Sequence, residues 1–142
     1  MSVISAGGAA TDRGLTRSTR FARTVFTIAG IWGLLIMTPL YFTFDAVGRA
    51  YPPPITHPDL YYGFIGVTLT WQIAFLVIAR NPVRYRTIML AAILEKGLYV
   101  ATMTTLCLQG QLPPGQAAAV IGPDGVLGLL FVASFLKTPA FP

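Results

Sequence analysis

Residues 25–44, VFTIAGIWGLLIMTPLYFTF, form a run without a single charged side chain. The hydrocarbon core of a bilayer is about 30 Å thick, and a helix needs about 20 apolar residues to cross it. This run therefore predicts a membrane-spanning helix. Three more apolar runs follow along the chain, at 61–79, 87–108 and 117–136. Because backbone polar groups in lipid must bond within their own segment, we expect all four runs to be α-helices.

The composition of the whole chain also indicates a membrane protein. Its 142 residues are 54% hydrophobic and 11% charged, and the mean hydropathy is +0.66. Soluble domains carry about 25% charged residues, so this composition argues against a soluble enzyme. One Cys107 and one His57 provide neither an internal disulfide nor a Cys/His zinc site. We therefore expect no metal and no cofactor.

The positions of Lys and Arg set the expected orientation. The basic residues before the first run, between the second and third, and after the fourth all fall on one side; they are Arg13, Arg17, Arg20, Arg23, Arg80, Arg84, Arg86 and Lys137. The loops on the other side hold only Arg49. Cytoplasmic loops are enriched in Lys and Arg, so we expect an up-down-up-down bundle with both termini in the cytoplasm. The net charge of +5 then serves membrane topology, and we expect no nucleic-acid partner.

The first segment, 1–23, differs from the rest in composition. It is rich in Ser, Thr, Ala, Gly and Arg and has no apolar segment typical of a secretory signal. We expect a disordered, basic cytoplasmic tail whose arginines lie against anionic lipid headgroups; the same composition would also suit a mitochondrial transit peptide. Residues 24–138 then form one transmembrane domain.

Small residues recur along each predicted helix and indicate where helices can approach closely. The pairs are Ala29 and Gly33, Gly63 and Gly66, Gly97 and Ala101, Ala118 and Gly122, and Gly125 and Gly128. Each helix therefore has a face suited to a neighbour.

Ionisable residues inside the predicted spans define the candidate polar core. They are Glu95, Lys96 and Asp124, and an Asp or Lys at the centre of a membrane helix costs about 2.5–3.5 kcal/mol. Such residues normally face the bundle interior and pair, so we predict that they converge, joined by Gln72 and Tyr99. Two acids against one lysine leave an excess negative charge, which a bound proton or an approaching cation would relieve.

A second candidate cluster lies in the longest outer loop, which contains Asp45, Arg49, His57 and Asp59. A histidine near two carboxylates can be a metal site or a proton relay. A solvated, salt-bridged loop is the interpretation that we favour for these four residues.

Several stretches resemble a group of small, mostly uncharacterised four-helix bacterial integral membrane proteins that are loosely DoxX-like. They are GFIGV at 63–67, WQIAFL at 71–76, IARNPVRYR at 78–86, LEK at 94–96 and DGVLGLLF at 124–131. The resemblance implies a multi-pass protein of the bacterial cytoplasmic (inner) membrane. It contains no diagnostic catalytic motif, and no residue role follows from it.

Three functions are compatible with these residues. We favour a non-catalytic bundle that binds a partner subunit or lipid through its membrane face or polar core, because no complete catalytic constellation is present. The expected partners are the bilayer, a membrane subunit or a second copy, and a lipid-soluble ligand. The alternatives are a small proton-coupled exporter, and a membrane enzyme in which Glu95 and Asp124 act as acid and base on a quinone or isoprenoid.

Overall fold

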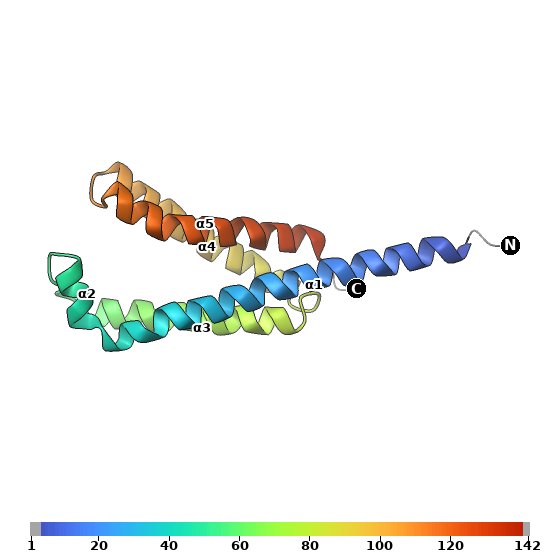
Figure 1. Ribbon diagram of the computed structural model, residues 1–142, viewed down its shortest axis with the longest axis horizontal. Coiled ribbons are helices and arrows are strands. Elements are labelled where there is room, and N and C mark those ends of the chain that lie inside the picture. Colours follow the sequence, from blue (N-terminus) through green and yellow to red (C-terminus); the bar gives the residue numbers. More distant parts are fainter. Residues whose placement is uncertain (1–3, 141–142) are drawn as a thin grey trace.

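The computed structural model describes residues 4–140, which form helices joined by loops, with no strand in that range (Figure 1). In chain order the elements are α1 (Ile4–Met37), the 3₁₀ helix η1 (Thr38–Phe42), α2 (Phe44–Ala50), α3 (Pro58–Arg80), α4 (Arg86–Leu108) and α5 (Pro114–Lys137). The predicted all-α fold is therefore confirmed. The prediction of four helices that are long and apolar enough to span a membrane is also confirmed, at Thr16–Phe42, Pro58–Arg80, Arg86–Leu108 and Pro114–Lys137.

Prolines set three helix boundaries that we misplaced from the sequence. The first helix ends at Met37 and continues as the tighter η1, because Pro39 cannot donate a backbone hydrogen bond and its ring clashes with the preceding turn. Helices α3 and α5 begin at Pro58 and Pro114, about one turn before the predicted starts, because proline is well tolerated at the first helical position. The outer loop also contains a short helix, α2, that we did not predict.

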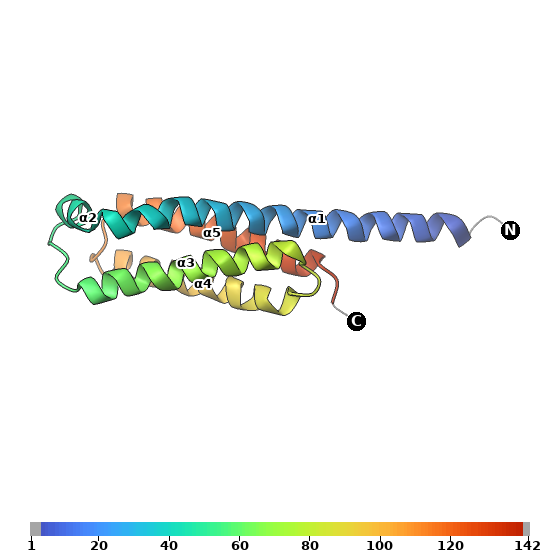
Figure 2. The same cartoon turned by 90° about the horizontal axis from the view of Figure 1, so that it is seen from below.

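Helix α1 begins much earlier than we expected. Of the segment predicted as a disordered tail, residues 4–23 are helical, and residues 1–3 lie outside the described residues. Since no proline occurs between Ile4 and Met37, no residue stops the spanning helix from continuing toward the N-terminus. Figures 1 and 2 show this first part of α1 extending beyond the rest of the bundle.

The four long helices form two pairs that diverge from one another. Helix α1 packs along α3, α4 packs along α5, and α1 also contacts α5. The helices alternate in direction along the chain (Figure 2). Although a short loop joins them, α3 and α4 pack against each other much less closely than either does with its pair partner. Figure 1 shows that the pairs meet at the end that holds this loop and separate toward the end that holds α2, so the bundle is wedge-shaped.

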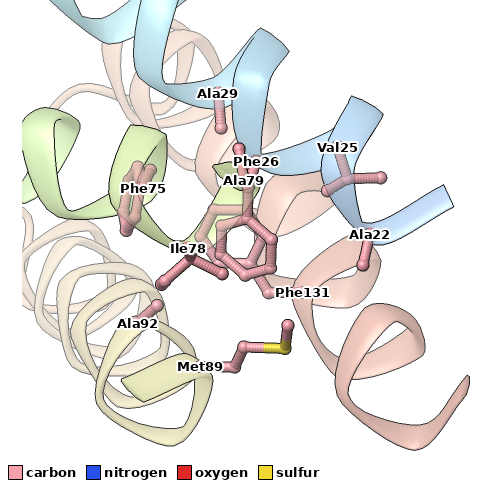
Figure 3. Packing of buried hydrophobic residues seen from close by; sticks show 10 residues of the cluster. All are labelled: Ala22, Val25, Phe26, Ala29, Phe75, Ile78, Ala79, Met89, Ala92 and Phe131. Carbon is pink, nitrogen blue, oxygen red and sulfur yellow. The ribbon is translucent and has the colours of Figure 1, made fainter. Parts of the chain in front are cut away.

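The apolar core lies at the closed end of this wedge (Figure 3). The ring centroids of Phe26 and Phe131 are 4.3 Å apart, and those of Phe75 and Phe131 are 4.9 Å apart, so aromatic rings join α1, α3 and α5. Smaller buried side chains surround them: Ala22, Val25, Ala29, Ile78, Ala79, Met89 and Ala92. The two helix pairs are thus held together at one end, and a cavity lined by residues of both pairs lies next to this core.

Candidate functional site

Three ionisable side chains meet in the space between the helix pairs. Nζ of Lys96 on α4 lies 2.5 Å from Oδ1 of Asp124 on α5. The same Nζ lies 3.3 Å from Oε2 and 3.5 Å from Oε1 of the adjacent Glu95. All three residues sit near the middle of their helices. The structure therefore brings Glu95, Lys96 and Asp124 together as one ion cluster.

Lysine 96 is the centre of this cluster and its most buried member. Only 8% of its side-chain surface is exposed, against 19% for Glu95 and 23% for Asp124. Its ammonium group also lies 5.6 Å from the ring centroid of Phe75, at the top of the apolar core. Close packing holds the lysine against α5, since a Cβ atom at Gly128 would lie 3.4 Å from Cβ of Lys96.

The ion cluster lines one side of a cavity of about 120 Å³ formed by all four long helices. Gln72 and Tyr99 line the same cavity, but among the described residues neither hydrogen-bonds to the three charged groups. The amide nitrogen of Gln72 donates instead to the carbonyl of Thr68 on its own helix, at 3.1 Å. The predicted five-residue core is thus a three-residue ion cluster with two polar neighbours in the cavity wall.

Apolar side chains form most of the remaining wall. They come from both helix pairs and are Ala29, Trp32, Ile36, Met37, Phe64, Pro123 and Leu127. Trp32, Ile36 and Phe64 are each about half exposed, at 54%, 49% and 50%. All three lie in segments that are long and apolar enough to span a membrane, so the exposed wall of the cavity has the apolar character that a bilayer requires.

Close approach of α1 and α3 fixes the position of Gln72. A Cβ atom at Gly33 would collide with the side-chain amide of Gln72, so any larger residue requires this buried amide to move. The small-residue face predicted at Ala29 and Gly33 therefore lies at a helix contact. By contrast, nothing lies within 4 Å of a Cβ atom placed at Gly63, Gly97, Gly122 or Gly125.

Of the four outer-loop candidates, His57 and Asp59 do not line the cavity that the other two share. Asp45 and Arg49 on α2 line a second cavity, of about 390 Å³. His57 is instead the residue that precedes α3, and Asp59 lies in its first turn. In the described part of the chain, no group of three or more His, Cys, Asp or Glu side chains is placed to hold a metal ion.

Sequence reasoning missed the apolar and hydroxyl residues of the cavity wall, chiefly Trp32, Phe64 and Thr68. Helical periodicity could have indicated two of them, Phe64 and Thr68. Phe64, Thr68 and Gln72 follow one another at four-residue spacing, so they share one face of α3. Trp32 is the neighbour of Gly33 on α1, but no rule of spacing indicates that its ring borders a cavity.

No protein-family model, no curated protein and no solved structure matches this chain. The chemistry that the cavity can support therefore has to be inferred from its own geometry. That geometry combines an ion cluster with a largely apolar and partly exposed wall, an arrangement suited to a molecule with one polar end and an apolar body.

Proposed function

We propose that this chain is a non-catalytic, multi-pass protein of the bacterial cytoplasmic membrane that binds the polar end of a lipid-soluble amphiphile in the cavity between its helix pairs. The observation that carries the proposal is the ion cluster of Glu95, Lys96 and Asp124 at the floor of an otherwise largely apolar cavity. A polar end of the ligand would meet the cluster, and its apolar part would lie along Trp32 and Phe64 toward the lipid.

The proposed orientation, with both termini in the cytoplasm, is supported by where basic side chains gather in the fold. The guanidinium of Arg23 donates to the carbonyl of Arg80 at 3.4 Å, and Nε of Arg86 donates to the carbonyl of Thr138 at 2.8 Å. These contacts tie the end of α3 to α1 and the start of α4 to the end of α5, at the closed end of the wedge (Figure 1). A basic end of a membrane protein normally faces the cytoplasm.

The ion pairing within the cluster favours ligand binding over catalysis or proton-coupled export. A general acid or base, or a carboxylate that carries protons for an exporter, has to exchange a proton during each cycle. Here Asp124 is held 2.5 Å from the lysine ammonium, and the lysine also contacts Glu95. The tight pair of Lys96 and Asp124, with Glu95 as an additional carboxylate beside it, can anchor a ligand without any such exchange.

The proposal can be tested by filling the cavity with a larger side chain and measuring which lipids stay bound to the purified protein. Leu127→Trp places a large ring in the cavity wall, whereas Val126→Trp places the same ring at a position that is 58% exposed beside it. Mass spectrometry of the purified protein should find an amphiphile retained in near-stoichiometric amount by the wild type and by Val126→Trp, and depleted in Leu127→Trp. Equal retention by both variants, or no enrichment over bulk lipid in the wild type, would overturn the proposal.

A further inference from the structure

The net charge of the ion cluster, which lines the cavity, restricts the charge of the ligand that the cavity can bind. Two carboxylates and one ammonium leave the cluster with an excess negative charge, which is unfavourable in a low-dielectric interior. The ammonium of Lys96 is already engaged by Asp124 at 2.5 Å and by Glu95 at 3.3 Å. An anionic ligand would therefore meet two carboxylates and a cation that is already paired, whereas a monovalent cation would bring the floor to neutrality.

The two carboxylates are not equivalent, and the difference points to Glu95 as the ligand-binding group. Asp124 has the shorter contact with the lysine. Oε2 of Glu95 is buried, and although it lies 3.3 Å from Lys96 Nζ, it accepts no hydrogen bond within residues 4–140. Buried polar atoms are almost always hydrogen-bonded. The Glu95 carboxylate thus has unused capacity to accept a hydrogen bond, and because the residue lines the cavity, a rotation of its side chain would present this oxygen to a ligand there.

The size of the cavity limits the polar end to a small group. An apolar cavity of about 150 Å³ is known to hold a benzene molecule, and the cavity here measures about 120 Å³. An ammonium group with its first carbon atoms is of suitable size. The rest of a long chain would extend past the half-exposed Trp32 and Phe64 into the bilayer.

We propose that the cavity selects amphiphiles whose polar end is a protonated amine, with Glu95 as its counter-ion. The amine supplies both the missing positive charge and N–H donors for the Glu95 carboxylate, while Lys96 stays paired with Asp124. This inference rests on the proposed function, because it names the chemical class of the amphiphile that the same cavity would bind.

Fluorescence of Trp32 provides a direct test, because the chain has only two tryptophans and Trp32 lines the cavity. The Trp71→Phe variant leaves Trp32 as the single reporter. It is placed in nanodiscs and titrated, near neutral pH, with a dodecyl amine, a dodecyl alcohol and a dodecanoic acid that all carry bromine, a fluorescence quencher, at the same chain position. We expect saturable quenching by the amine at a concentration at least tenfold lower than for the other two.

Matched variants separate the carboxylate from general effects. In the same background, Glu95→Gln should weaken amine binding at least tenfold, and since it leaves a neutral Lys96–Asp124 pair it should still fold. Asp59→Asn removes an acid in the first turn of α3, outside the cavity, and should leave amine binding unchanged. Trp32→Phe, which leaves only Trp71, should show non-saturating quenching that is equal for the three compounds.

The outcomes distinguish this inference from the proposed function beneath it. Saturable binding of the alcohol or the acid, as tight as that of the amine, would overturn the selectivity for amines and leave an amphiphile-binding cavity in place. Amine binding that is unaffected by Glu95→Gln would overturn the role of Glu95. If none of the three compounds gives saturable quenching of Trp32, the inference fails, whereas the proposed function fails only if Leu127→Trp and Val126→Trp retain lipid equally or the wild type shows no enrichment.

Discussion

Nζ of Lys96 and Oδ1 of Asp124 lie 2.5 Å apart and join α4 to α5 near the middle of both helices. Glu95, the residue beside Lys96, forms a longer contact with the same ammonium group. The cluster therefore contains one tight ion pair and one additional carboxylate. This asymmetry leads to different expectations for the removal of each charge.

Lys96→Met should be the most destabilising single change in the cluster. It leaves two buried carboxylates without a cation, and removal of one partner from a buried ion pair typically costs about 3–5 kcal/mol. Glu95→Gln removes only the additional charge, so the free energy of unfolding should stay the same or rise slightly. Asp124→Asn should lie between these two, since Glu95 remains as a partner for the lysine.

Thermal unfolding in detergent micelles, followed by circular dichroism, checks this order of stabilities. The matched control is Asp45→Asn, which removes an acid from the exposed outer helix α2 and should have little effect. A Lys96→Met protein as stable as the wild type would contradict the idea that the lysine holds the two acids together.

Gly33→Ala should weaken the contact between α1 and α3. The new methyl group would collide with the amide of Gln72, and overpacking of a close contact costs about 1–3 kcal/mol. Gly97→Ala is the matched control, because nothing lies within 4 Å of a Cβ atom at that position. The double variant Gly33→Ala with Gln72→Ala should recover most of the lost stability, since it removes the colliding amide. Additive losses in this double-mutant cycle would show that the collision is not the cause.

How much of this molecule its sequence can predict depends on the physical origin of each feature. The four spans follow from length and hydropathy, because an apolar run of sufficient length has few alternatives in a bilayer. The meeting of Glu95, Lys96 and Asp124 follows from the penalty for exposing charge to lipid. Both inferences depend on strong, local energetic constraints.

The wedge shape and its cavity could not be predicted in this way. They depend on which faces of the helices actually pack, and small residues alone do not decide that. Gly33 is needed for close packing on Gln72, whereas Gly97 is equally small and has open space beside it. The early start of α1 at Ile4 was missed for a related reason: the composition of the tail suggested disorder, but it contains no proline to end a helix.

The orientation of the bundle can be tested with cysteine labelling, since the chain has a single native cysteine, Cys107. In a Cys107→Ala background, Arg84→Cys places a thiol in the exposed α3–α4 loop, and Pro54→Cys places one in the exposed outer loop. If the termini are cytoplasmic, a membrane-impermeant maleimide added to intact spheroplasts should label Pro54→Cys and spare Arg84→Cys. The reverse pattern would contradict the proposed orientation.

Arg86 should matter more for stability than its neighbour Arg84, although both are basic residues at the connection between α3 and α4. Nε of Arg86 lies 2.8 Å from the carbonyl of Thr138 and 3.3 Å from that of Phe135, and its guanidinium lies 3.8 Å from the centroid of the Phe135 ring. These carbonyls belong to the C-terminal end of α5, where a helix presents unpaired acceptors and a partial negative charge.

Arg86→Ala should therefore lower the free energy of unfolding by about 2–3 kcal/mol, since hydrogen bonds from charged groups are each worth about 1.5–3 kcal/mol. Arg84→Ala should change it by less than about 0.5 kcal/mol, the usual range for surface positions. Both variants remove one positive charge within two residues of each other, so any effect on membrane orientation is matched between them. Arg86→Lys should fall between the two, because lysine keeps the charge but lacks the planar group that both bonds the carbonyls and stacks on Phe135. Equal unfolding midpoints for Arg84→Ala and Arg86→Ala, measured in the same detergent, would show that the α5 terminus does not depend on this arginine.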